Sequence, residues 1–327
     1  MLLMTLLIGC TSQTGPDSNT GVFQTPEQAT AARKAKLLID WQEMAARIAN
    51  AERPDIKTIK GEGFSLHLSA DGVEQTLDLT PLTEKLSSAA GKEREPIRAY
   101  LNLKVPEFDR ARLAKMPFEQ ARLMIHPQLY NARQTTALAA PDTGKAPITN
   151  AVVIDLNWIP AIRWPGSEAR TPVDADMAAE WKIPAEQVSA AAMENLKQEF
   201  AARTQNPIET TDLPGLGRYG SLRSGVDPAI LLLPDFVAAV RKEWKTDDDL
   251  VVFLPSRNSI NVIERKNERL LNRMIPEWTS IYAKSTDPMI SSMILASDKG
   301  LSLLSYSASS NKPATAPATK PAPYIVH

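Results

Sequence analysis

The chain has 327 residues, with 37 basic and 38 acidic side chains that leave a net charge of −1, and 43% of its residues are hydrophobic. This length is typical of two domains with sizeable cores, and the balanced charge argues against a nucleic-acid partner, which would need a basic surface. One cysteine excludes an internal disulfide, and together with three scattered histidines it argues against a zinc site. We therefore expect neither a metal nor any other cofactor.

The first ten residues are typical of a bacterial lipoprotein signal. Residues 2–9 are apolar or small except for Thr5, and they lead into Leu7-Ile8-Gly9-Cys10, a lipobox pattern. The stretch is too short to span a bilayer, which takes about 20 residues. Signal peptides normally open with Lys or Arg; here either the α-amino group supplies that charge or the true start lies upstream. We predict a signal peptide over 1–9 and a lipid on Cys10, the alternative being a chance cysteine after a hydrophobic start.

Lipidation of Cys10 predicts where the protein works. Lipoproteins carry two or three acyl chains, which hold a protein to a membrane far more stably than one chain does. We therefore expect the body of the protein outside the cytoplasm, in the bacterial cell envelope, anchored to the outer membrane or at the periplasmic face. Thr11 favours outward sorting, because an Asp after the cysteine would suggest retention at the inner membrane.

Two segments have the composition of flexible chain. Residues 10–25 are rich in Ser, Thr, Gly and Asp and predict a tether between the lipid and the folded body. Residues 307–327 are rich in Pro, Ala, Ser and Thr and predict a disordered tail with polyproline character. A spacer that contacts peptidoglycan is the alternative for this tail.

Residues 26–133 predict a helix, a hairpin and a further helix. Apolar residues at three-to-four-residue spacing indicate a helix over 26–50. Alternating strands over 64–68 and 76–80 flank Asp71-Gly72, a hairpin turn. A helix is expected from Pro81 toward Leu103. Residues 134–149 carry Thr, Ala, Pro and Gly without periodicity, so we predict a domain linker there.

Residues 150–306 alternate strands with helices. A buried strand over 151–156 is expected, with residues 159–164 returning beside it. The other expected elements are helices over 175–181, 184–203, 235–244 and about 270–282, and strands over 250–254, 259–263, 292–296 and 301–306. Hairpins interleaved with helices predict an α+β fold of antiparallel sheets with helices packed on one face. The recurrence of these units also suggests two similar subdomains.

Three stretches of this region carry a family resemblance. They are residues 192–196 (Ala-Met-Glu-Asn-Leu), 231–236 (Leu-Leu-Leu-Pro-Asp-Phe) and 249–258 (Asp-Leu-Val-Val-Phe-Leu-Pro-Ser-Arg-Asn). They resemble DUF1444 (YtpQ-like), a bacterial family of unknown function whose strand ends in Pro-Ser-Arg-Asp. Here Asn258 replaces the final acid. The resemblance covers about half the chain and implies a fold but no activity or cofactor, and since typical members look cytosolic, a lipid anchor is a departure from them.

The turn Ser256-Arg257-Asn258 is the strongest candidate site. An arginine at a strand end can bind a carboxylate or phosphate through two hydrogen bonds. Ser256 as a nucleophile would need a base, and none is evident nearby. The alternative is a hairpin turn in which Ser256 and Asn258 bind backbone groups.

Three other polar features are weaker candidates. Glu194 and Asn195 lie within the predicted helix 184–203 and are either a buried hydrogen-bonding pair or part of a ligand site. The glycine-rich segment 213–225 lacks the pattern of a phosphate-binding loop, so we predict a mobile loop whose Arg218 and Arg223 could border a cleft. Asp247 to Asp249 lack the spacing of a calcium loop and predict a solvated turn.

Taken together, these features predict a membrane-anchored envelope protein that binds or scaffolds an envelope protein or a peptide, without catalysis. A hydrolase of envelope components using Ser256 and Arg257 is one alternative. A chaperone-like, peptide-binding module with an open sheet edge is the other.

Overall fold

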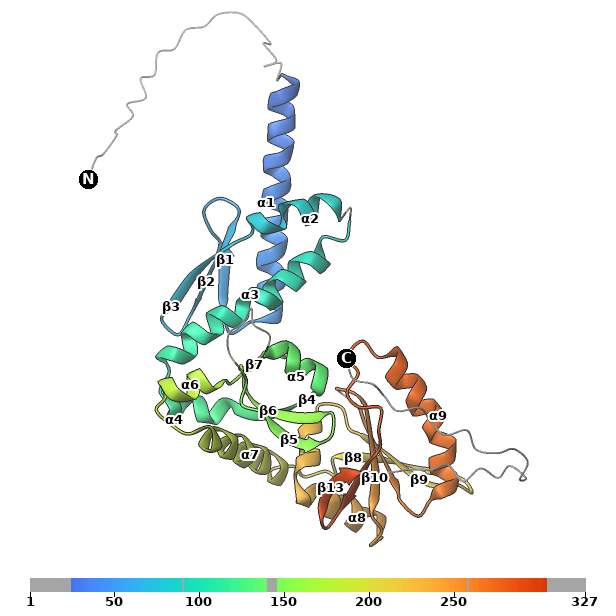
Figure 1. Cartoon of the computed structure of the whole chain (residues 1–327). Helices are drawn as coiled ribbons and strands as arrows, with labels where there is room; N and C mark the ends of the chain where they lie inside the picture. The colour runs from blue at the N-terminus through green and yellow to red at the C-terminus, as the bar shows by residue number, and fades with distance from the viewer. Residues whose placement is uncertain (1–24, 90, 140–145, 258, 305–327) are drawn as a thin grey trace, which may run out of the picture.

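The computed structural model describes residues 25–89, 91–139, 146–257 and 259–304, so Cys10, the predicted signal peptide and the predicted tail lie outside the described residues. These residues form an α+β fold of antiparallel sheets, as predicted, with three-, four- and six-stranded sheets in chain order (Figure 1). No helix in these ranges is both long and apolar enough to cross a membrane.

The N-terminal unit packs two helices on one face of a small sheet. Its elements are α1 (Pro26–Glu52), β1 (Lys57–Lys60), β2 (Ser65–Ala70), β3 (Val73–Asp78), η1 (Thr80–Leu82), α2 (Thr83–Ser88) and α3 (Arg94–Lys115). Thr25 caps α1 through a capping box with Gln28, a side-chain arrangement that satisfies two backbone N–H groups at a helix start. The predicted first helix and hairpin are therefore confirmed, whereas β1 was not predicted.

The helix predicted from Pro81 toward Leu103 is wrong as a single element. The chain forms η1 and α2, turns at Gly91 with a φ of +87°, and starts α3 afterwards. Glycine adopts a positive φ more readily than residues with a side chain, and the helical path does not continue through this position. Beyond this break α3 continues to Lys115, well past the predicted end.

The central sheet combines strands from both sides of the predicted linker. It contains β4 (Ile125–Asn131), β5 (Asn150–Val153), β6 (Leu156–Arg163) and β7 (Arg170–Pro172), with β6 pairing all three others. Because β4 pairs with β6, the segment 134–149 does not separate two sheets. Its first residues belong to α5 (Ala132–Leu138), so the structureless linker predicted there is wrong over these positions.

The single buried strand predicted over 151–156 is also wrong. It is the tip of the β5–β6 hairpin, where Asp155 has a φ of +65° and the Ile154 side chain is 73% exposed. Asp tolerates this left-handed conformation because its short side chain can bond locally. The predicted helices 175–181 and 184–203 are confirmed as α6 (Ala175–Glu180) and α7 (Ala185–Ala201), and α4 (Phe118–Ala121) with η2 (Arg122–Met124) leads into β4.

The C-terminal sheet is built from three hairpins in the order β13-β12-β10-β11-β9-β8. Its strands are β8 (Ile208–Leu213), β9 (Gly217–Leu222), β10 (Leu250–Ser256), β11 (Ser259–Glu264), β12 (Ile294–Ser297) and β13 (Gly300–Leu303). The connecting helices are η3 (Pro228–Leu232), α8 (Pro234–Trp244) and α9 (Glu268–Lys284). The last four strands and both long helices were predicted from their periodicity.

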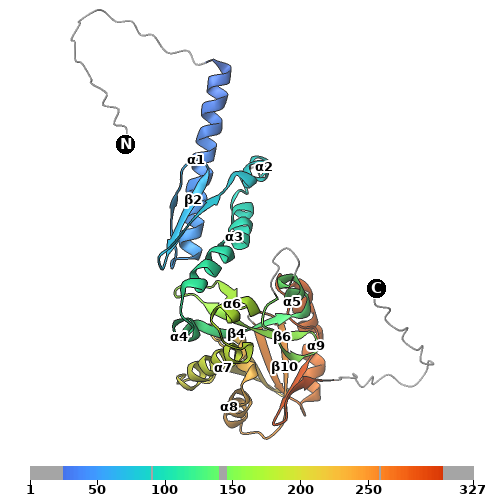
Figure 2. The ribbon, with the colours of Figure 1, turned by 60° about the vertical axis from the view of Figure 1, so that its left-hand side comes forward.

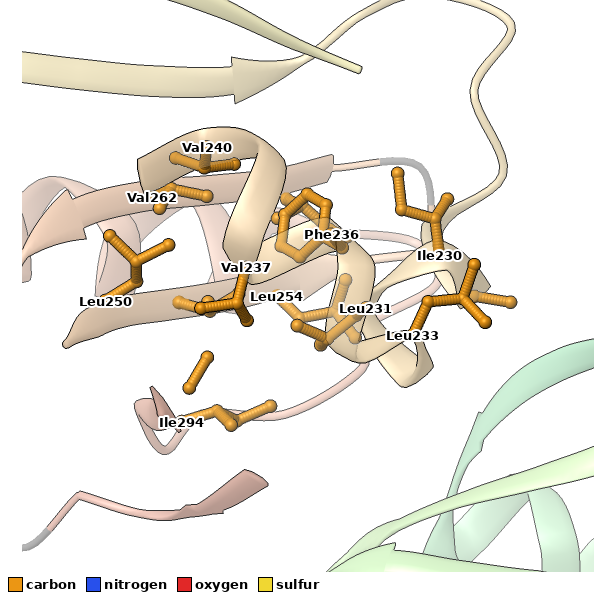
Figure 3. Packing of buried hydrophobic residues seen from close by; sticks show 14 of the residues in the cluster. Ile230, Leu231, Leu233, Phe236, Val237, Val240, Leu250, Leu254, Val262 and Ile294 are labelled. Carbon is orange, nitrogen blue, oxygen red and sulfur yellow. The ribbon is translucent and has the colours of Figure 1, made fainter. Parts of the chain in front are cut away.

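Helices cover both faces of this sheet, so the prediction of helices on one face is wrong here. Leu250, Val252 and Leu254 of β10 join the cluster under α8 (Figure 3). The alternate residues Val251 and Phe253 join the cluster under α9, where the Phe253 ring stacks 5.1 Å from that of Trp278. A strand that is apolar at every position is the pattern expected when both faces are buried.

The three-stranded sheet of residues 57–78 and the six-stranded sheet of residues 208–303 differ in strand number and strand order, so these two sheets are not copies of one subdomain. The mobile loop predicted over 213–225 is largely the β8–β9 hairpin. Position 220 of β9 requires glycine, because a Cβ there would lie 2.5 Å from Ile208 Cγ2 and 2.9 Å from Trp244.

A buried ion network joins the N-terminal unit to the central sheet. Arg53, in the turn after α1, donates two hydrogen bonds to Asp109 of α3, both 2.7 Å, and two to Asp55. Arg112 donates to Asp55 at 2.6 Å and to Asp71 at 2.6 Å. The side chains of Arg53, Asp55, Asp109 and Arg112 are 2–7% exposed. Each charge is therefore withdrawn from water and neutralised by several partners.

The network continues into the loop between β6 and β7. Thr171 donates to Asp109 at 2.8 Å and accepts from the Trp164 indole at 2.8 Å. The Arg112 guanidinium lies 3.8 Å from the centroid of the Trp164 ring, within the range of a cation–π contact. Ser167 adds a bond to the carbonyl of Glu52. The position of residues 164–171 is thus fixed by α1 and α3.

We expect Asp109→Ala to lower the free energy of unfolding by about 3–5 kcal/mol, the usual cost of removing one partner of a buried ion pair. Urea unfolding measures this. Glu43→Ala is the matched control, because the Glu43–Lys60 pair has both side chains 48% exposed and such pairs contribute less than about 1 kcal/mol. Similar losses in the two variants would contradict a special role for Asp109.

Candidate functional site

Arg257, the predicted site residue, is bound by the protein itself. Its Nε donates to Asp287 Oδ2 at 2.5 Å, its Nη1 donates to the carbonyl of Leu129 at 3.2 Å, and its guanidinium lies 4.9 Å from the Tyr130 ring centroid. These contacts tie the β10–β11 turn to β4 and to the segment after α9. They show a structural use of Arg257.

The other predicted residues do not converge on Arg257. Ser256 pairs with Ser259 and forms a bridge to Pro288, and Asn258 lies outside the described residues. Glu194 is exposed and accepts from Gln198 one turn along α7. Asn195 has a structural role. Its Nδ2 donates to the carbonyls of Arg122 at 2.6 Å and Ile125 at 2.7 Å, and these bonds join α7 to the start of β4.

A polar cleft of about 830 Å³ lies elsewhere, beside the β6–β7 loop. Three parts of the chain line it: residues 163–170, Glu199 of α7, and residues 222–228 between β9 and η3. The first of these is the loop that the buried ion network fixes. The cleft therefore has one wall held rigidly by the N-terminal unit.

Strand register brings three basic side chains to one face of the central sheet. His126 of β4 is paired with Ala161 of β6, and Arg163, two residues further along β6, is paired with Arg170 of β7. Because side chains alternate between the two faces of a sheet, His126, Arg163 and Arg170 lie on the same face. Arg163 and Arg170 line the cleft.

Arg163 is the organising cation of the cleft. It donates to Glu199 at 2.9 Å and to Asp227 at 2.9 Å, and so connects α7 with the β9–η3 segment. Arg203 also donates to Glu199, at 3.1 Å. The Nε of Arg163 is buried and lacks a hydrogen-bond partner among the described residues. A buried donor without a partner is costly, and because this atom has almost no exposed surface, a ligand in the cleft does not reach it.

Arg170 and Arg223 line the same cleft without a carboxylate partner. In the described part of the chain, neither guanidinium has an Asp or Glu oxygen within 4.0 Å. Arg170 donates to the carbonyls of Ser167 and Ala169, and Arg223 donates to that of Asn206. Burial and the nearby charge of Arg163 lower the pKa of Arg170. Two guanidinium groups thus line one cleft without a direct ion pair among the described residues, although Glu168, Glu199 and Asp227 line it as well; the guanidinium N–H groups are the donors that a carboxylate or phosphate needs.

His126 is a neutral imidazole behind this group. Its Nδ1 is buried without a hydrogen-bond partner among the described residues and lies 3.7 Å from Glu199 Oε2. Burial first, and the positive charge of Arg163 second, lower the pKa of His126 to about 4, although Glu199 acts in the opposite direction. Glu199 and Asp227 both act on His126, but the described residues contain no group of three or more His, Cys, Asp or Glu side chains that could hold a metal ion.

Sequence reasoning found only one residue of this cleft. Arg223 was noted as a possible cleft residue and lines it, whereas Arg218 donates to Glu264 at 3.0 Å. His126, Arg163, Arg170 and Glu199 lie on separate elements, and no spacing along the chain relates them. The pairing register of β4, β6 and β7 brings the residues of these strands together, and the sequence alone did not reveal that register.

Comparisons with known proteins add no relative. No family model, no curated protein and no solved structure matches this chain. The resemblance to the DUF1444 family therefore stays a prediction, and the function has to be argued from the cleft.

We expect the stability of the protein to fall by up to about 3 kcal/mol between pH 6.5 and pH 4 through His126, since each pKa unit corresponds to about 1.4 kcal/mol. The unfolded chain takes up a proton near pH 6.5, but the folded protein does so only near pH 4. Protonation therefore favours the unfolded state as the pH falls, and the stability is fully present above pH 6.5.

Urea unfolding at pH 7, 5.5 and 4.5 measures this effect. His126→Gln should flatten the pH dependence over this range, whereas His67→Gln, at a site whose side chain is 33% exposed, should leave it as in the wild type. An unchanged slope in His126→Gln would contradict the buried, neutral state of His126.

Proposed function

We propose that this protein is an envelope-anchored binding module that takes an anionic ligand in the polar cleft. The observation that supports this most strongly is the pair Arg170 and Arg223, which line one cleft without a carboxylate partner. Planar guanidinium groups bind carboxylates and phosphates through paired, charge-assisted hydrogen bonds, so the cleft offers the donors that an anion needs.

A binding role is better supported than a hydrolytic one. A general base at neutral pH works best with a pKa near 7, and His126, whose pKa is about 4, is a weak base. The alternative nucleophile, Ser256, pairs with Ser259 and bridges Pro288, and its neighbour Arg257 is held by Asp287. These contacts favour a structural role for the turn that the hydrolase alternative would use.

The proposed location rests on the lipobox and agrees with the shape of α1. Residues 26–40 of α1 are exposed, except for the half-buried Leu38, and the N-terminal end of the helix extends beyond the neighbouring elements (Figure 2). At 1.5 Å per residue, residues 26–40 are about 20 Å long. A lipid on Cys10 followed by such a helix would hold the cleft away from the membrane surface.

We expect acetate and inorganic phosphate to bind saturably at the cleft at low ionic strength. Loss of one charge-assisted hydrogen bond costs about 1.5–3 kcal/mol, so Arg170→Ala and Arg223→Ala should each weaken anion binding about tenfold or more. A ¹H–¹⁵N NMR titration measures the affinity and shows whether the shifted resonances belong to residues 163–170 and 222–228.

Arg273→Ala is the matched control, because it removes an exposed arginine of α9 that is not part of the cleft. Its anion affinity should equal that of the wild type. If all three variants bind both anions as the wild type does, the proposed anion site is wrong.

For the anchor, we expect Cys10→Ala to move the protein from the membrane fraction to the soluble fraction and to abolish labelling by radioactive palmitate. Cys10 is the only cysteine in the chain, so no second thiol can substitute for it. Ser12→Ala, next to the predicted lipobox, should leave both readouts unchanged. Palmitate labelling that persists in Cys10→Ala would exclude lipidation at this residue.

A further inference from the structure

A second cavity, of about 600 Å³, adjoins the polar cleft. It lies where the end of α1, the middle of α3 and the β6–β7 loop meet. Much of its lining is apolar: Ala49, Ala51, Leu101, Val105, Pro106 and Ala169. We refer to this second cavity as the apolar groove.

The apolar groove and the polar cleft lie against the same loop. Gly166, Glu168 and Arg170 line both cavities. A ligand held by Arg170 in the cleft can therefore place another part of itself in the groove. This continuity makes the groove part of one bipartite site.

Three of the charged groups at the groove are already occupied: Arg53, Asp109 and Glu52, which accepts from Arg98 at 2.6 Å, whereas Glu168 and Arg170 line its β6–β7 side. Arg53 and Asp109 line it, but they donate to and accept from each other and their other network partners, and both side chains are nearly fully buried. Pro106 has no backbone N–H, so it offers no donor. What remains for a ligand is mainly apolar contact, which suits an aliphatic chain better than a peptide backbone, whose polar groups would need partners.

The charge balance of the cleft favours a singly charged head group over a doubly charged one. Arg163, Arg170 and Arg223 are matched in number by Glu168, Glu199 and Asp227, all of which line the cleft. A phosphate monoester with two charges would be repelled by these carboxylates more strongly than a monocarboxylate. A carboxylate also matches the planar fork of a guanidinium.

We propose that the ligand is a long-chain monocarboxylate, with its carboxylate at Arg170 and Arg223 and its aliphatic chain in the apolar groove between α1 and α3. This inference rests on the proposed anion site and adds the chemical class of its ligand. Each methylene that the groove buries should tighten binding about fourfold.

Isothermal titration with acetate, hexanoate and decanoate, each below its micelle concentration, tests the proposal. Decanoate should bind the wild type at least tenfold more tightly than hexanoate. Asn102→Trp places a large side chain in the groove from an exposed position on α3. It should remove the gain from the longer chain and leave acetate binding unchanged. Leu103→Trp is the matched control, since Leu103 is 65% exposed and does not line the groove; it should behave as the wild type.

The outcomes separate the two proposals. If decanoate binds no better than acetate while acetate binding still depends on Arg170 and Arg223, the monocarboxylate proposal is overturned and the anion site stands. If no anion binds, both are overturned. Tighter binding of decyl phosphate than of decanoate, or of a tripeptide with a C-terminal leucine, would replace the aliphatic carboxylate with another ligand class.

Discussion

The contact between Arg53 and Asp109 is the constraint on which the arrangement of the molecule depends. Two charges with almost no exposure to water are tolerable only if each has several hydrogen-bond partners, and these partners come from α3, the turn after α1, and β7. The geometry that satisfies them fixes where the N-terminal unit sits on the central sheet. The β6–β7 loop, which borders both cavities, is placed by the same bonds.

Arginine serves two opposite purposes on the two sides of this loop. Arg53 and Arg112 are neutralised by three aspartates and act as structural connectors. Arg170 and Arg223, only partly buried, have only backbone carbonyls as acceptors among the described residues. A partly desolvated cation without a counter-ion is less stable than a paired one, and an anionic ligand would relieve that cost. The same residue type is therefore structural where aspartates neutralise it, and it keeps donors for a ligand where only backbone carbonyls accept from it.

The elements that the sequence predicted are those whose periodicity is local. The α9 stripe and the apolar run of β10 were read directly, because burial on one or both faces leaves its pattern in consecutive residues. β4 was missed because Pro127 interrupts its pattern, and β9 because its glycines resemble a loop. The cleft was missed because its residues meet only through strand register, and the partner of Arg257 could not be predicted because Asp287 lies 30 residues away.

The apolar groove lies at the C-terminal end of α1, whereas the proposed anchor precedes the N-terminal end of this helix in the sequence. The groove contacts Ala49 and Ala51, near the last turns of a 27-residue helix that is about 40 Å long at 1.5 Å per residue. In the proposed site, the aliphatic chain of a monocarboxylate would be shielded from water by α1 and α3. A site of this kind would suit a protein that binds an amphiphile one molecule at a time.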